Sequence, residues 1–116
     1  MPYHGSCHCG AVTFSVDADM PDKAMSCNCS HCRRKGFLLS FVPAADFTVE
    51  RGADATTEYR FNSRKIAHKF CTACGCQPFA EGIDKEGKQT RMINLRCVPD
   101  CDLDALDIQK VDGASH

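Results

Sequence analysis

Residues 71 to 76 read Cys-Thr-Ala-Cys-Gly-Cys, and a second pair of closely spaced thiols lies near the amino terminus in Cys7-His8-Cys9. Thiols this close in sequence are poor disulfide partners for each other, but together they can bind one soft cation. Two such pairs complete a tetrahedron, so they predict a structural zinc with four thiolate ligands: Cys7, Cys9, Cys71 and Cys74. The zinc would clamp the start of the chain to its middle across about sixty residues and so restrict the unfolded chain.

A third group of thiols lies between these two pairs. Cys27, Cys29 and Cys32 fall within six consecutive residues. Three protein ligands and one exchangeable position are the usual arrangement of a catalytic zinc, which lowers the pKa of a bound substrate thiol. The spacing also allows a second structural site, with its fourth ligand drawn from Cys76, Cys97, Cys101 or a histidine. The residues alone leave both interpretations open.

Length and composition limit the other functions. A chain of 116 residues predicts one domain, spanning residues 1–116. Lysine plus arginine is 14 and aspartate plus glutamate is 15, which argues against nucleic-acid binding through bulk positive charge. No apolar run approaches membrane-spanning length, and the first residues lack an apolar signal core. We therefore expect a cytoplasmic protein without a membrane partner, in which ten cysteines are metal ligands or redox groups.

The hydrophobic periodicity predicts a mainly β fold. Residues 11–17 alternate, with Val12, Phe14 and Val16 on one face. Residues 37–42 are apolar except for one serine, which predicts a strand buried on both faces. Further strands are expected over residues 47–50, 57–61, 66–70, 77–81 and 91–97.

Helix signals are few. Residues 30–35 predict one helical turn after Cys29, and residues 102–106 predict another with Asp102 as its cap. Turns are expected at Asn62-Ser63 and over residues 84–88. Most phenylalanines are expected in the core, namely Phe14, Phe37, Phe41, Phe61, Phe70 and Phe79. Gly75 directly follows the zinc knuckle Cys71–Cys74, where the chain is expected to turn with a positive φ.

Four linked motifs carry a resemblance to a known family. They are Gly5-Ser6-Cys7-His8-Cys9-Gly10, Cys27-Asn28-Cys29-Ser30-His31-Cys32-Arg33, Cys71-Thr72-Ala73-Cys74-Gly75, and Asn94-Leu95-Arg96-Cys97 followed by Asp102-Leu103-Asp104-Ala105-Leu106. In this order they resemble the glutathione-dependent formaldehyde-activating enzyme family, the type of domain also found in centromere protein V. The match covers nearly the whole chain.

The resemblance implies a β-tent fold of small coiled antiparallel sheets held by zinc knuckles. It implies a structural zinc on Cys7, Cys9, Cys71 and Cys74, and a catalytic-type zinc on Cys27, Cys29 and Cys32. The implied activity is condensation of glutathione, or a related thiol, with formaldehyde or a small aldehyde to give S-hydroxymethylglutathione. In the reverse direction this is a carbon–sulfur lyase. One departure is Cys76, where a small or hydroxylated residue is expected, so that Cys76 could complete the open site or pair with Cys74.

Charged and aromatic residues near the knuckles have two interpretations each. Arg33 and Arg34, followed by Lys35, could bind the carboxylates of glutathione or form a solvated basic turn. The histidines in or near the knuckles could bind zinc or move a proton, or could simply face water: His8, His31 and His68. Cys97 is expected to be a small buried apolar residue.

Two other functions compete with the enzyme. A zinc-stabilised module without chemistry could use the same scaffold to bind a partner, and a fourth protein ligand at the Cys27 group would favour it. A redox protein similar to methionine sulfoxide reductases would need an Arg-x-Cys-x-Asn-Ser run, for which Arg96-Cys97-Val98-Pro99 is a poor substitute.

Overall fold

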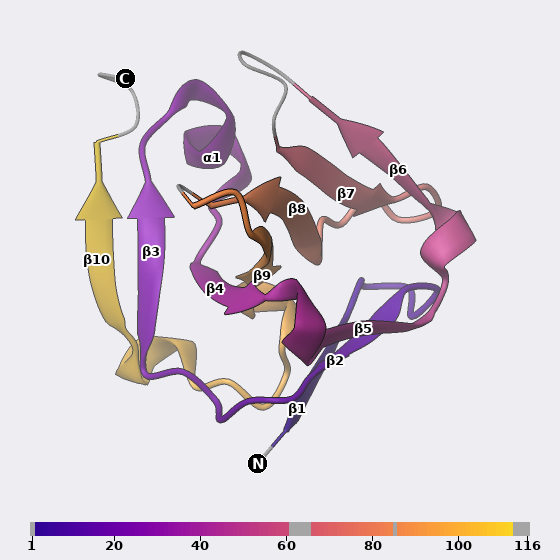
Figure 1. Ribbon diagram of the computed structural model, residues 1–116, viewed down its shortest axis with the longest axis horizontal. Helices are drawn as coiled ribbons and strands as arrows, with labels where there is room; N and C mark the ends of the chain where they lie inside the picture. The colour runs from indigo at the N-terminus through magenta and orange to yellow at the C-terminus, as the bar shows by residue number, and fades with distance from the viewer. Residues whose placement is uncertain (1, 61–65, 85, 113–116) are drawn as a thin grey trace.

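The computed structural model describes residues 2–60, 66–84 and 86–112. In this part of the chain, strands dominate and form two sheets (Figure 1). The smaller sheet has the order β1-β2-β5, with β1 at Tyr3–Ser6, β2 at Thr13–Val16 and β5 at Phe47–Arg51, and its pairs are antiparallel. The predicted mainly β fold is confirmed.

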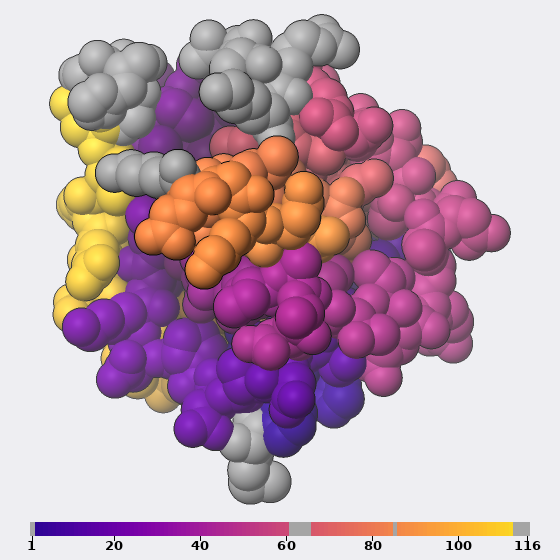
Figure 2. Space-filling model, viewed as in Figure 1, coloured from indigo at the N-terminus to yellow at the C-terminus, as the bar shows by residue number. Residues whose placement is uncertain are grey.

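The larger sheet has the order β10-β3-β4-β9-β8-β7-β6. Its strands, in chain order, are β3 (Lys23–Cys27), β4 (Leu39–Pro43), β6 (Thr56–Tyr59), β7 (Ala67–Cys71), β8 (Phe79–Ile83), β9 (Gln89–Asn94) and β10 (Asp107–Val111). All pairs are antiparallel except β10 with β3, which run parallel and form one flank of the molecule (Figures 1 and 2). The expected antiparallel sheets are thus confirmed except for this one parallel pair.

The α-helix of the described residues, α1, spans Ser30–Lys35, as predicted. Cys29 caps its start, because its sulfur accepts a hydrogen bond from the N–H of Cys32. Gly36 ends it in the left-handed region with φ of 70°, and its N–H donates to the Cys32 carbonyl. Short 3-10 turns occur at Ala44–Asp46, Ala53–Ala55, Leu95–Cys97 and Leu103–Ala105. The last is capped by Asp102, as expected.

Three aromatic rings join the two sheets. Phe14 and Phe47, from the smaller sheet, have ring centroids 5.4 Å apart, and Phe79 of β8 lies 4.8 Å from Phe47. Val12, Phe14 and Val16 are all fully buried, which confirms the predicted face of β2. This interface is the main hydrophobic core.

A second, smaller core lies under α1 and fixes the helix on the larger sheet. It consists of Cys32, Phe37, Leu39, Ala80 and Met92. Because Cys32 is both buried and part of the thiol group, packing of α1 also places the three-cysteine group.

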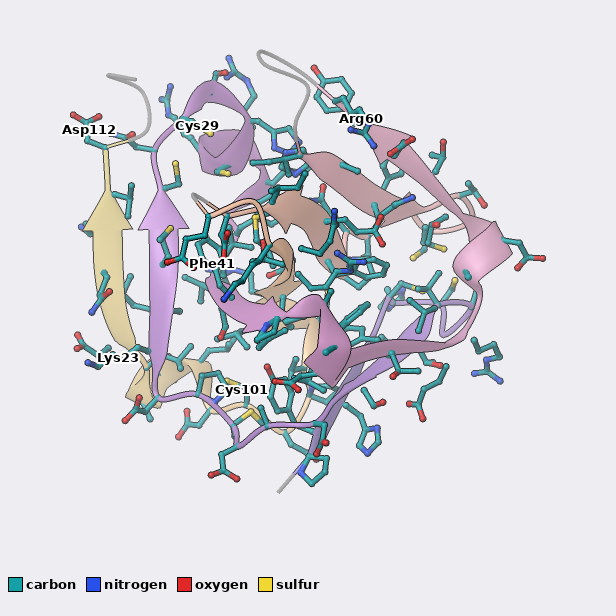
Figure 3. All side chains as sticks on the ribbon, in the orientation of Figure 1. Lys23, Cys29, Phe41, Arg60, Cys101 and Asp112 are labelled. Carbon is teal, nitrogen blue, oxygen red and sulfur yellow. The ribbon has the colours of Figure 1, made fainter. Side chains whose placement is uncertain are left out.

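Several expectations differ from the structure. The prediction that residues 37–42 are buried on both faces is wrong at Phe41, whose side chain is labelled in Figure 3 and is 52% exposed. Phe70 is only half-buried and lines a cavity. Phe61 and the Asn62-Ser63 turn lie outside the described residues. The expected turn over residues 84–88 is closed by a hydrogen bond from the Asp84 N–H to the Lys88 carbonyl.

Candidate functional site

Two groups of cysteines come together, at different places on the fold. In the first, the sulfurs of Cys7, Cys9, Cys71 and Cys74 all lie within 4.8 Å of one another. Cys7 follows β1, and Cys71 ends β7, so this group joins the smaller sheet to the larger one.

Backbone N–H groups around the first group donate hydrogen bonds to its sulfurs. The N–H of Val12 donates to the Cys7 sulfur at 3.3 Å, and the N–H of Ala73 donates to the Cys71 sulfur at 3.4 Å. The chain reverses directly after Cys74 at Gly75, whose φ of 79° confirms the positive value expected there. Such N–H···S contacts stabilise thiolates.

The pKa values of Cys9 and Cys74 are shifted in opposite directions. The backbone N–H groups of Cys76 and Cys9 lower the pKa of Cys74 to about 5. The N–H of Ala11 favours the Cys9 thiolate, but the neighbouring thiols of Cys7 and Cys71 prevail and raise the pKa of Cys9 to about 11. Four sulfurs this close cannot all be negative unless a cation lies among them.

The sulfur spacing of the first group fits zinc and not a disulfide. The Cys7 and Cys9 sulfurs are 3.6 Å apart, and those of Cys9 and Cys71 are 3.7 Å apart. A tetrahedron with Zn–S bonds of about 2.3 Å has sulfurs about 3.8 Å apart, whereas a disulfide needs about 2.05 Å. These residues therefore fit a four-thiolate zinc site.

The second group consists of Cys27, Cys29 and Cys32, whose sulfurs also lie within 4.8 Å of one another. Cys27 ends β3, Cys29 caps α1, and Cys32 lies inside the helix. The group as described holds three sulfurs, which is the ligand number of a site with an exchangeable fourth position. Cys29 and Asp112 lie at the same end of the molecule (Figure 3).

The thiols of the second group differ in acidity. Burial opposes ionisation of Cys29, but hydrogen bonds from the backbone and thiol of Cys32 and from the His31 backbone prevail and lower the pKa of Cys29. Burial and the neighbouring Cys29 raise the pKa of Cys32. Cys29 is therefore more acidic than Cys32.

A cavity of about 390 Å³ opens beside the second group. It is lined by Ser26, Cys27, Asn28, Cys32, Arg33, Gly36, Lys110, Val111 and Asp112. Two cations, Arg33 and Lys110, therefore flank the cysteines. The Asn28 side-chain amide donates to the Asp112 carboxylate at 3.0 Å and ties the end of β10 to the start of α1.

The structure separates residues that the sequence places together. Arg33 lines the Cys27 cavity, whereas Arg34 and Lys35 line a different one. Lys110 could not be found from spacing, because it reaches the cavity through the parallel pairing of β10 with β3.

The remaining cysteines lie outside both groups. Cys76 and Cys97 line a cavity of about 370 Å³ beside Cys7, at the first group. Burial, and then the thiols of Cys76 and Cys7, raise the pKa of Cys97 to about 12. Cys101 is buried in the main core. All ten cysteines are unbridged.

The histidines near the knuckles have different surroundings. His8 is exposed, whereas His68 is buried with its Nδ1 3.0 Å from the Gln77 amide nitrogen. His31 packs against His68 with ring centroids 4.2 Å apart. In the described residues, none of the three joins either cysteine group within 4.8 Å.

A mainly β chain with clustered groups of four and three cysteines defines a class of small proteins built around candidate zinc sites. Residues 2–108 match the glutathione-dependent formaldehyde-activating enzyme family, and the chain belongs to this family. The resemblance carried by the four motifs is thus confirmed.

Known proteins similar to this chain include one from Halomonas elongata and one from Rhodobacter sphaeroides. A protein of Halomonas elongata, provisionally named as a glutathione-dependent formaldehyde-activating enzyme, is 31% identical to this chain. The alignment covers 74% of this chain and 68% of the Halomonas protein. The crystal structure of a Rhodobacter sphaeroides protein superposes with a TM-score of 0.80 at 29% identity and covers 93% of this chain and 99% of its own. The described helices of this chain are all too short or too polar to cross a bilayer.

Proposed function

We propose that this protein is a zinc-dependent carbon–sulfur lyase that combines glutathione with formaldehyde to S-hydroxymethylglutathione and catalyses the reverse reaction. The proposal rests on family membership and on the three-cysteine group beside a cavity with two cations. We further propose that residues 1–116 act as one domain. A reducing compartment such as the cytoplasm is proposed because all ten cysteines are unbridged.

We assign two roles to the cysteine groups. Cys7, Cys9, Cys71 and Cys74 would hold a structural zinc, which is supported by their number and sulfur spacing. Cys27, Cys29 and Cys32 would hold a second zinc at the reaction site. Zinc bound there would supply a Lewis acid that lowers the pKa of a substrate thiol.

The cavity residues would bind and orient glutathione. Arg33 and Lys110 are suited to the two carboxylates of this tripeptide, since charge-assisted hydrogen bonds to carboxylates are among the stronger polar contacts. The Asn28–Asp112 hydrogen bond would keep the wall formed by β10 in place. Arg34 is left out of this role because it lines the other cavity.

The reaction needs no further reactant. The thiol sulfur forms a bond to the aldehyde carbon, the π electrons of the carbonyl move to its oxygen, and that oxygen takes up the proton lost by the thiol. Formaldehyde adds thiols readily in water, so the protein would contribute mainly capture and orientation.

One observation carries the proposal: a group of three thiols lies beside a cavity that two of them, Cys27 and Cys32, line together with Arg33 and Lys110. Exchange NMR spectroscopy with glutathione and formaldehyde tests it by measuring interconversion above the protein-free rate. We expect Cys29→Ser to reduce the rate to that of the protein-free sample. Cys76→Ser is the matched control, because Cys76 lies outside both groups, and it should retain the rate.

The competing function is a zinc-stabilised binding module without chemistry. Wild-type protein that fails to exceed the protein-free rate while holding both zinc ions would establish this alternative. Unchanged interconversion in Cys29→Ser would show that the chemistry does not take place at the second group.

A further inference from the structure

A second cavity, of about 360 Å³, lies on the other side of α1. It is lined by His31, Arg34, Lys35, Tyr59, Phe70 and Gln77. Residues three and four apart share one face of a helix, so positions 31, 34 and 35 face this cavity while positions 32 and 33 face the Cys27 cavity. The two cavities have no lining residue in common.

Three of its six lining residues carry flat rings. The rings of His31 and Tyr59 are stacked, with centroids 5.5 Å apart and an interplanar angle of 24°. Phe70 comes from β7, next to the β6 strand that carries Tyr59, and both side chains lie on the sheet face that α1 covers in part. Ring faces arranged in this way favour a flat unsaturated ligand over a flexible polar one.

Two cations also line this cavity, and one of them lies over an aromatic ring. The Lys35 Nζ lies 5.8 Å from the centroid of the Phe70 ring, and the Arg34 Nη1 donates to the Ser30 carbonyl at 2.8 Å. Within the described ranges, neither has a carboxylate within ion-pair distance of 4.0 Å. Their charge is therefore available to an anion at the cavity mouth.

We propose that this second cavity binds a planar aromatic carboxylate, with its ring against Tyr59 and Phe70 and its carboxylate on Lys35 and Arg34. Glutathione suits this cavity poorly, because it is polar along its whole length and offers no ring to the apolar wall. The ligand class follows from the combination of aromatic rings with two cations that have no carboxylate partner among the described residues. It goes beyond the proposed lyase activity and does not depend on it.

The test is isothermal titration calorimetry of the full chain with 2-naphthoate. We expect saturable binding with a Kd below about 1 mM. The uncharged 2-naphthamide, which has the same ring system, should bind at least about fivefold more weakly because it cannot pair with the cations.

Variants on the two sides of α1 decide where the ligand binds. The double variant Arg34→Gln with Lys35→Gln should weaken 2-naphthoate at least about fivefold. Arg33→Gln, one residue away on the other face, should leave it unchanged. All three positions are exposed, so these variants should fold.

Absence of saturable binding up to about 10 mM would overturn the proposal. So would equal affinity for the amide, or a loss of affinity in Arg33→Gln that matches the loss in the double variant. None of these results bears on glutathione exchange, which is measured separately.

Discussion

Arg33 and Arg34 are adjacent in sequence but line two different cavities on opposite sides of α1. Arg33 shares its cavity with Cys27 and Cys32, whereas Arg34 shares its cavity with Tyr59 and Phe70. A run of basic residues on a short helix thus contributes to two separate surfaces.

This separation predicts unequal effects on glutathione. Arg33→Gln should raise the KM for glutathione about fivefold with little change in kcat, because it removes a contact made equally in ground and transition states. Arg34→Gln should leave both constants near wild type. Steady-state kinetics of S-hydroxymethylglutathione formation measure the two variants side by side, and equal effects would contradict the assignment.

The exposed Cys9 provides a test of the first zinc site. An exposed cysteine normally changes stability little when replaced. As a zinc ligand, however, Cys9→Ser should remove one zinc per chain and lower the Tm by more than about 10 °C. His8→Ala, at the neighbouring exposed position, is the control and should change neither zinc content nor Tm. Elemental analysis and thermal melts would settle it, and a Cys9→Ser variant with full zinc content would refute the four-thiolate site.

The buried His68 predicts a dependence of stability on pH. Burial, and next the neighbouring His31, lower the pKa of His68 to about 4. An unfolded histidine binds a proton below about pH 6.5, whereas folded His68 resists it until about pH 4. The contribution of neutral His68 to stability is therefore fully present above about pH 6.5. The free energy of unfolding then falls by about 3 kcal/mol as the pH drops toward 4.

Urea unfolding between pH 7 and pH 4.5 measures this effect. His68→Gln lacks the titrating ring, so its free energy of unfolding should fall less steeply than that of the wild type. His4→Gln, at an exposed histidine, should keep the wild-type slope. Identical slopes for wild type and His68→Gln would show that His68 does not titrate as inferred.

A close approach between strands predicts that Gly5 cannot be replaced. A Cβ on Gly5 would lie 2.7 Å from the Phe14 Cε1 and 2.8 Å from the Cys97 carbonyl oxygen. Phe14 is fully buried and cannot move away without disturbing Phe47 and Phe79. Gly5→Ala should therefore cost about 1–3 kcal/mol of the free energy of unfolding. Ser6→Ala is the control for denaturant melts, and a stable Gly5→Ala protein would contradict the packing.

Elements with strong local patterns were predictable from the sequence. The alternation of Val12, Phe14 and Val16 predicts the strand β2, and Asp102 predicts the cap of the 3-10 turn. The strands β1, β3 and β10 were missed. They lack a run of alternating apolar residues, and β10 depends on pairing with a strand about eighty residues earlier, which local periodicity does not encode.

The same distinction applies to the candidate site. Short spacing predicts which cysteines share a centre, because a knuckle brings its own thiols together. Lys110 and the separation of Arg33 from Arg34 depend on strand pairing and on the rotation of α1 over the sheet. These features depend on the tertiary structure, so a local sequence motif does not predict them.

The parallel pairing of β10 with β3 has a consequence for how the protein matures during translation. Cys27, Cys29 and Cys32 emerge from the ribosome early, but Lys110 and Asp112 emerge some eighty residues later. In a nascent chain, the three thiols can therefore come together long before β10 forms the cavity wall beside them. The glutathione pocket proposed here would be completed only after β10 has paired with β3.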